Sequence, residues 1–293
     1  MSCLNLKAKN HMTYETKDIL YFRGNNGSRN ITPIKYGETI RYNDLEIIAH
    51  NAGHILGSAQ FEVRSPNSTL VYTGDINYRN MLTTNAADAI SCDILILETT
   101  YGHPNYIFPR LGETCVEIVN WALGKLKDDK IPIFQVYSTG KAQEIIKIFN
   151  EFTKIPVYVY PTVAKVNRAY EKNGVKLAYN VLNSDEENSS LESKQCVLVV
   201  PNHYKTFPVQ RYSLAVATGW VLKFRSSRFS GAFPISGHAD FKQLVAYVKK
   251  VNPKAVFTTH GFEGYFANYL SKKLGINARP MISIKQKPLQ EYL

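Results

Sequence analysis

The sequence predicts an α/β protein with a sheet-rich first part and a second part in which strands alternate with helices. Its 293 residues are 44% hydrophobic, which suffices for one large core or two medium ones. Four strand-like apolar runs follow one another between residues 45 and 100. From residue 112 onward, helical and strand patterns alternate at the spacing of βαβ units, which predicts a parallel sheet.

The four early strands are predicted from runs of apolar and β-branched residues. Their sequences are LEIIAHNAG, AQFEVRS, TLVYTGD and CDILILETT. The PNS tripeptide at residues 66–68 supplies a turn between the second and the third. We therefore expect a layered, sheet-rich first part.

The later elements begin with a helix after Gly112, where apolar residues recur at helical spacing. The elements predicted after it are a strand at IPIFQVY, a helix over 140–150, a strand at IPVYVY, a helix over 162–172, strands at CVLVVP and SLAVATGW, a helix over 240–250, a strand at AVFTTH and a helix over 262–274. The polar, acidic stretch at 183–194 is predicted to be an exposed loop.

Positive charge is concentrated in the second part of the chain. The net charge is +11, yet residues 1–105 sum to −1 and residues 106–293 sum to +12. Such a regional excess favours a polyanion partner, because each neutralised phosphate releases a counterion. Charge alone leaves a solvated basic surface without a partner as the alternative.

The N-terminus and the cysteines argue against several protein classes. No run approaches the ~20 apolar residues that cross a bilayer, and MSCLNLKAKNHM lacks the apolar core of a signal peptide. We therefore expect an intracellular, cytoplasmic protein without membrane contact. The four cysteines lie far apart with no CxxC pair, so neither a disulfide framework nor a thiolate zinc site is indicated.

Three candidate metal ligands lie in loops or at the ends of predicted strands. His54 lies in AGHILGS among small residues, Asp75 follows the strand TLVYTG, and His260 ends AVFTTH. Sites of α/β proteins gather at the carboxyl ends of strands, where a carboxylate is a fair ligand candidate. Each residue alone has a structural explanation, but three separate turns explain the set less easily.

Glu98 and His238 form a different kind of pair. Glu98 follows the strand CDILIL, and His238 lies in a Ser-Gly-flanked loop before a helix that Asp240 is predicted to cap. A carboxylate beside an imidazole orients the ring and raises its pKa, which makes the ring a proton donor near neutral pH. Phosphodiester cleavage needs such a donor for the leaving oxygen.

The motifs AGHILGS, TGD, ETTYG, SGHAD and TTHG, in this order, resemble those of the β-CASP family of metallo-β-lactamase-fold nucleases. The resemblance runs from about Lys35 to Lys273, and VYSTGKAQEI resembles the start of a helix in the family's insertion. The ATGW and PISGHADF segments and the modest length resemble ligase-associated DNA exonucleases and archaeal RNA 3′-end processing factor-like exonucleases.

The resemblance implies a metallo-β-lactamase αββα sandwich with an inserted β-CASP α/β domain. Residues 1–105 and 229–293 would form the sandwich, and residues 106–228 the insertion. It also implies two zinc ions, bound by His54, by Asp75 as the bridging ligand, and by His260. Glu98 and His238 match the motifs of members that cut nucleic acids, so the implied activity is hydrolysis of DNA or RNA by an exonuclease.

One family motif has no counterpart in this sequence. The family carries a His-x-His-x-Asp-His cluster upstream, whereas residues 1–50 contain only His11 and His50, at the wrong spacing. Three ligands shared by two ions leave each with about two, so we expect weak zinc binding and little hydrolysis from this polypeptide. We favour a shortened form of an active nuclease over a non-catalytic nucleic-acid-binding relative or a scaffold for partner proteins.

Candidate substrate contacts lie outside the five motifs. The segment WVLKFRSSRF interleaves aromatic residues with basic ones, which suits stacking on bases beside neutralised phosphates. Its candidates are Trp220, Lys223, Arg225 and Arg228, although a strand with a basic solvent face explains it equally well. Lys141, at a predicted helix start, is a candidate phosphate ligand or an ordinary surface lysine. The sequence leaves DNA or RNA, the direction of attack and a homo-oligomer open.

Overall fold

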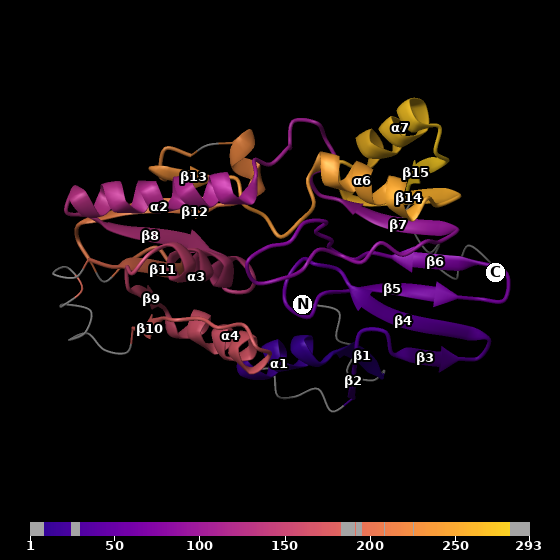
Figure 1. The fold of residues 1–293 in the computed structure, drawn as a ribbon, viewed down its shortest axis with the longest axis horizontal. Helices are drawn as coiled ribbons and strands as arrows, with labels where there is room; N and C mark the ends of the chain where they lie inside the picture. The colour runs from indigo at the N-terminus through magenta and orange to yellow at the C-terminus, as the bar shows by residue number, and fades with distance from the viewer. Residues whose placement is uncertain are drawn as a thin grey trace, which may run out of the picture.

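The computed structural model describes residues 9–24, 30–182, 191, 195–207, 209–224 and 226–281. Two sheets lie side by side along the long axis of the molecule, one of six strands and one of seven (Figure 1). The predicted α/β fold is confirmed. Apart from Leu191, the predicted acidic loop at 183–194 falls outside the described residues.

The seven-stranded sheet contains the four early strands predicted from sequence. Its order is β15-β14-β7-β6-β5-β4-β3. The bounds are β3 (Thr39–Tyr42), β4 (Leu45–Asn51), β5 (Ala59–Arg64), β6 (Thr69–Tyr72), β7 (Ile94–Thr99), β14 (Ala255–Gly261) and β15 (Ala278–Pro280). Strands β3 to β6 pair antiparallel, whereas β6, β7, β14 and β15 pair parallel. The parallel strands therefore share one carboxyl edge.

The six-stranded sheet is parallel at every pairing, in the order β10-β9-β11-β8-β12-β13. The bounds are β8 (Ile131–Val136), β9 (Val157–Val159), β10 (Asn180–Val181), β11 (Val197–Pro201), β12 (Tyr212–Ala217) and β13 (Gly231–Phe233). Every residue of β8 and β11 is buried, as expected for central strands covered on both faces. The connecting helices are α2 (Leu111–Lys127), α3 (Lys141–Phe152) and α4 (Pro161–Lys172).

Two helices close the chain against the seven-stranded sheet. They are α6 (Phe241–Val251) and α7 (Glu263–Leu274), and both contribute to the core beneath β7 and β14 (Figure 1). The predicted N-cap is confirmed, since the Asp240 carboxylate accepts a hydrogen bond from the Gln243 amide at 2.8 Å. Within the described ranges, no helix is long and apolar enough to span a membrane.

The N-terminal elements had no counterpart in the sequence prediction. They are β1 (Asn10–Thr13), α1 (Tyr14–Phe22) and β2 (Ile31–Ile34). Helix α1 packs on α4, with Ile19 buried among Val166, Ala169 and Tyr170. The first elements of the chain thereby contact a helix of the six-stranded part.

The segment after β12 is not the strand considered from sequence. Residues Gly219–Leu222 form a short 3-10 helix, η2. Gly219 packs so closely on aromatic rings that an added Cβ would lie 2.5 Å from Phe108 and 2.6 Å from Tyr101. Packing against these rings, which periodicity does not encode, turns the chain away from the sheet.

Candidate active site

His54 lies in the loop between β4 and β5 and is held from two sides. Its backbone amide donates to Ser58 Oγ at 3.0 Å, and its ring Nδ1 lies 2.9 Å from the carbonyl oxygen of Gly237. A carbonyl only accepts, so Nδ1 carries the proton and Nε2 keeps its lone pair. His54 is therefore oriented as a ligand.

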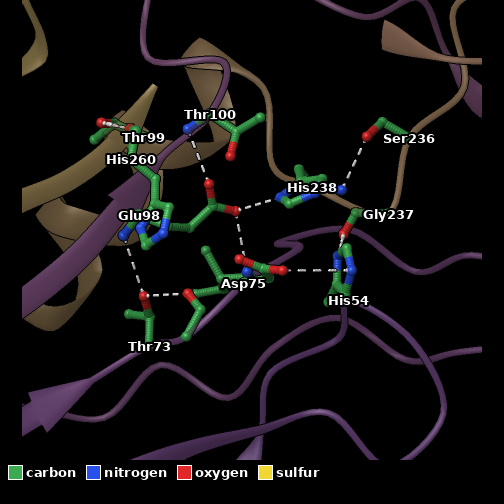
Figure 2. A network of polar contacts seen from close by, with 12 residues as sticks. His54, Thr73, Asp75, Glu98, Thr99, Thr100, Ser236, Gly237, His238 and His260 are labelled. Carbon is green, nitrogen blue, oxygen red and sulfur yellow. Dashed lines mark hydrogen bonds and ion pairs between the residues drawn. The ribbon is translucent and has the colours of Figure 1, made fainter. Parts of the chain in front are cut away.

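Asp75 follows β6 and faces the free nitrogen of His54. Its Oδ2 lies 3.8 Å from His54 Nε2, and about half of its side chain is exposed (Figure 2). The preceding Gly74 has a φ of +55°, a conformation that glycine adopts without strain. The turn at the end of β6 thus presents the carboxylate to solvent beside the imidazole.

Next to these two residues, the buried Glu98 forms an ion pair with the partly buried His238. His238 Nδ1 lies 2.8 Å from Glu98 Oε1, and the Glu98 carboxylate also accepts the backbone amides of Ile76 at 3.1 Å and Thr100 at 2.9 Å (Figure 2). The Ser236 hydroxyl accepts from the His238 amide at 3.0 Å. The pair predicted from sequence does form, with Nε2 of His238 left for another partner.

The two imidazoles differ in pKa. Burial, together with the nearby His238, lowers the pKa of His54 to about 4, so its ring is neutral near pH 7. Burial also acts to lower the pKa of His238, but the hydrogen bond and charge of Glu98 outweigh it and raise that pKa. In turn, burial acts to raise the pKa of Glu98, and the bond to His238 lowers it overall. One ring is set to bind a cation and the other to hold a proton.

The side chains of His54, Asp75 and His238 converge on one point. Their ligand atoms all lie within 4.8 Å of one another, and the ring centroids of the two histidines are 4.4 Å apart. Among the described residues, this is the one group of three or more such side chains that can hold a metal ion. Two imidazoles and a carboxylate suit a single zinc ion with an open position.

The structure does not bring His260 into this group. Its side chain is exposed, its Nδ1 lies 3.0 Å from Thr259 Oγ1, and in Figure 2 its ring lies on the other side of Glu98 from His238. The pairing of β14 with β7 shifts register between Thr259 and Gly261, and His260 has a φ of 58°. This irregularity at the strand end sets the direction of the ring.

Comparison with known proteins agrees with the motifs. Residues 232–280, which contain His238 and His260, match the domain family described as the Zn-dependent metallo-hydrolase RNA specificity domain. A probable DNA ligase of Opitutus terrae is 30% identical over 249 residues, covering 82% of this chain and 24% of the ligase. The RNase J-like protein of Methanocaldococcus jannaschii is 25% identical over 301 residues, covering 85% of this chain and 70% of that protein.

The chain belongs to the β-CASP family of metallo-β-lactamase-fold proteins. A crystal structure of a protein of unknown function from Enterococcus faecalis V583 has the same fold, with a TM-score of 0.67 and 14% identity. The alignment covers 96% of this β-CASP protein and 75% of that chain.

A pocket of about 630 Å³ adjoins the site between the two sheets of the β-CASP protein. His54 and His238 line one side. The other side is formed by residues after the strands of the six-stranded sheet, namely Ser138, Thr139 and Gly140 after β8, Asn202 and His203 after β11, and Thr218 after β12. Carboxyl ends of parallel strands commonly form binding sites, and this signal was present in the predicted strands.

Lys141 and Glu144 join helix α3 to the two loops of the site. Lys141 Nζ donates to the carbonyl oxygen of Ile235 at 2.8 Å, and burial lowers the pKa of Lys141 to about 8. Glu144 is buried and accepts the backbone amides of Leu82 at 3.2 Å and Thr83 at 2.8 Å. Lys141 lines the pocket, yet its described partner is the loop that carries His238.

Neither of the two described basic candidates of the WVLKFRSSRF segment, Lys223 and Arg228, lines the pocket at the site. Trp220 lines the pocket and is 37% exposed, and Lys223 is exposed after η2. Arg228 lies over the ring of Phe229 and lines a separate depression. Arg225 falls outside the described residues.

Proposed function

We propose that this β-CASP protein is a zinc-dependent nuclease that hydrolyses phosphodiester bonds of single-stranded RNA or DNA. The observation that carries the proposal is the convergence of His54, Asp75 and His238 within 4.8 Å beside a pocket, with Glu98 bonded to His238. Similarity to an RNase J-like protein and a probable DNA ligase supports a nucleic-acid substrate.

His54 and Asp75 would hold the ion. The low pKa of His54 keeps a lone pair available on Nε2, and the half-exposed carboxylate of Asp75 faces it at 3.8 Å. Bound zinc would polarise a phosphate oxygen and lower the pKa of a bound water. With His238 left as the proton donor, only two protein ligands hold the ion, which predicts modest affinity. A second ion, with His260 as a ligand, remains part of the proposal from the family resemblance.

The Glu98–His238 pair would supply the proton for the leaving oxygen. Glu98 stabilises the protonated ring, and its two backbone amide bonds fix the carboxylate in place. His238 Nε2 is the nitrogen left to face substrate, since Nδ1 is bonded to Glu98. A well-placed acid of this kind contributes about 10²- to 10⁴-fold to the rate.

A second assignment makes His238 the third zinc ligand. The observation that favours it is the distance, since the His238 ligand atom lies as close to His54 and Asp75 as a shared ion requires. A nitrogen bound to zinc cannot donate a proton, so the two assignments exclude each other. We adopt the proton donor, because the Glu98 carboxylate bonded to Nδ1 at 2.8 Å stabilises a protonated ring.

The pocket supports an exonuclease. Its volume of about 630 Å³ falls within the ~300–1,000 Å³ of pockets that enclose small ligands, which suits the end of a strand. In this proposal residues 1–105 and 229–293, apart from β13 of the six-stranded sheet, carry the chemistry. The insertion at 106–228 binds the strand through hydroxyl and amide groups such as Thr139 and Asn202.

The test is cleavage of end-labelled RNA and DNA strands in the presence of zinc. We expect slow stepwise shortening by the wild-type chain, in keeping with its incomplete ligand set, and none by Asp75→Asn, whose neutral side chain keeps the shape of aspartate. Equal cleavage by both chains would overturn the proposal. Salt-sensitive binding by the wild type without any cleavage would instead identify a non-catalytic binding protein.

A further inference from the structure

A row of four rings runs along the surface from the edge of the pocket. Its members, here called the ring row, are Trp220, Phe262, His103 and Tyr265. Successive ring centroids are 6.4 Å apart for Trp220–Phe262, 5.3 Å for Phe262–His103 and 4.3 Å for His103–Tyr265. The rings come from η2, the start of α7 and the loop after β7, so the fold brings together three distant segments.

The outer face of the ring row is accessible to solvent. Trp220 is 37% exposed and Tyr265 is 42% exposed, while Phe262 and His103 are partly exposed. Other large rings in this region are buried in the fold, so the row is an open part of a larger aromatic cluster. It offers ring faces and edges to a ligand.

The inner face of the row is rigidly supported. Tyr101 and Tyr106 are 2% and 3% exposed, and each packs on Trp220, with centroids 4.8 and 5.2 Å away. Tyr106 also lies 5.4 Å from Phe262. Rings fixed by such packing lose little conformational entropy when a ligand binds.

The row is continuous with the proposed catalytic pocket. Trp220 lines that pocket together with His238, and Tyr101 lies 6.1 Å from the His238 ring. A strand whose end occupies the pocket would therefore leave it across Trp220. Lys223, exposed one turn after Trp220, places a positive charge beside this exit.

We propose that the ring row binds successive bases of a single-stranded nucleic acid that extends from the pocket. The proposal rests on the proposed function, since it takes the pocket as the place where the strand ends. Aromatic rings accept any base, because every base has a π face, and the +12 charge of residues 106–293 suits a polyanion. The row thus gives affinity for unpaired strands of any sequence.

The experiment compares the affinities of long and short strands by fluorescence anisotropy without added metal, so that cleavage does not interfere. Strands of about 12 nucleotides would reach the row, and strands of about 3 would fill only the pocket. We expect the His103→Ala/Tyr265→Ala variant to bind the long strand about 5- to 100-fold more weakly than the wild type. Its affinity for the short strand should be unchanged.

Two controls separate stacking from other effects. Tyr265→Phe keeps the ring and should bind the long strand with wild-type affinity. Tyr42→Ala removes a 67% exposed ring on the distant strand β3 and should also leave that affinity unchanged. RNA and DNA strands should lose affinity alike. Two results would overturn the proposal that the ring row binds bases. They are an unchanged affinity of the double variant for the long strand, or an equal loss of affinity for both strand lengths. Binding of long strands by the wild type without cleavage after zinc is added would contradict the proposed nuclease activity. It would leave the proposal that the ring row binds bases intact.

Discussion

The two sheets present different chemistry where their strands end. The seven-stranded sheet ends in titratable groups, with Asp75 after β6 and Glu98 within β7, and both are fixed by short turns or backbone amides. The six-stranded parallel sheet ends mostly in hydroxyl and amide groups, such as Thr139 after β8 and Asn202 after β11, with the imidazole of His203 beside them. The pocket lies between them, lined by His54 and His238 on one side and by Thr139 and Asn202 on the other.

This difference assigns the chemical step to the end of the seven-stranded sheet and substrate binding to the end of the six-stranded sheet. A carboxylate or imidazole moves protons and holds metal ions, so its pKa and direction must be set by neighbours. Neutral hydroxyl and amide groups bind phosphates or bases over a wide pH range without such tuning. Helix α3 then links the halves, because Lys141 and Glu144 bond to loops of the seven-stranded part.

The largest expected effect is on catalysis. His238→Ala removes the proposed proton donor and should lower the rate of strand cleavage about 10²- to 10⁴-fold. The matched control is His203→Ala, which removes the pocket histidine of the other sheet and should raise KM while kcat stays near the wild-type value. Steady-state kinetics on a labelled strand distinguish the two. A kcat loss of equal size in both variants would contradict the separation of roles.

The next effect is on stability and concerns helix α3, which links the six-stranded part to the seven-stranded part. Glu144→Ala leaves the amides of Leu82 and Thr83 without their acceptor, which should lower the free energy of unfolding by about 2–4 kcal/mol. Glu151→Ala, on the same helix, removes a surface carboxylate that pairs with Lys147 and should change the free energy of unfolding much less than Glu144→Ala does. Urea unfolding measures both, and equal losses would show that Glu144 is not a buried link.

A glycine in the His238 loop should be intolerant of a side chain. The Cβ of Gly237→Ala would lie 2.5 Å from the His54 carbonyl oxygen, so we expect a loss of about 1–3 kcal/mol in thermal or urea unfolding. Gly124→Ala, within α2, meets nothing within 4 Å and should stabilise the protein by about 0.5–1 kcal/mol. Unchanged stability of Gly237→Ala would mean that the loops carrying His54 and His238 are not packed as described.

The smallest effect is a pH dependence. Burial lowers the pKa of Lys141 to about 8 from 10.5, so between these values the unfolded chain binds more protons than the folded one. The destabilisation is therefore complete below about pH 8 and disappears as the pH rises toward 10.5.

Lys141→Met removes this titration. The variant should gain about 1–2 kcal/mol relative to the wild type near pH 7, and the gain should shrink near pH 10. Urea unfolding of both chains at the two pH values gives the comparison. Lys147→Met, on the same helix, provides the control for loss of a partly buried lysine that keeps an ion pair with an exposed partner, Glu151. A difference that does not vary with pH would refute the burial of charge at Lys141.

Sequence predicted the elements better than it predicted the partners of side chains. The strands before Asp75 and Glu98 are unambiguous apolar runs, and their predicted positions match β6 and β7. The direction of His260 depends on a register shift in β14, which a pattern of residues does not encode. Likewise, Lys141 resembles a surface lysine at a helix start until tertiary packing places Ile235 over it.

Zinc titration of three variants tests the central claim most directly. The claim is that His54 and Asp75 hold the ion while His238 donates a proton. The account predicts that His54→Ala and Asp75→Asn each weaken zinc binding more than about 10-fold, whereas His238→Ala keeps wild-type zinc affinity and loses cleavage. Loss of zinc binding in His238→Ala, or unchanged binding in the other two, would contradict it.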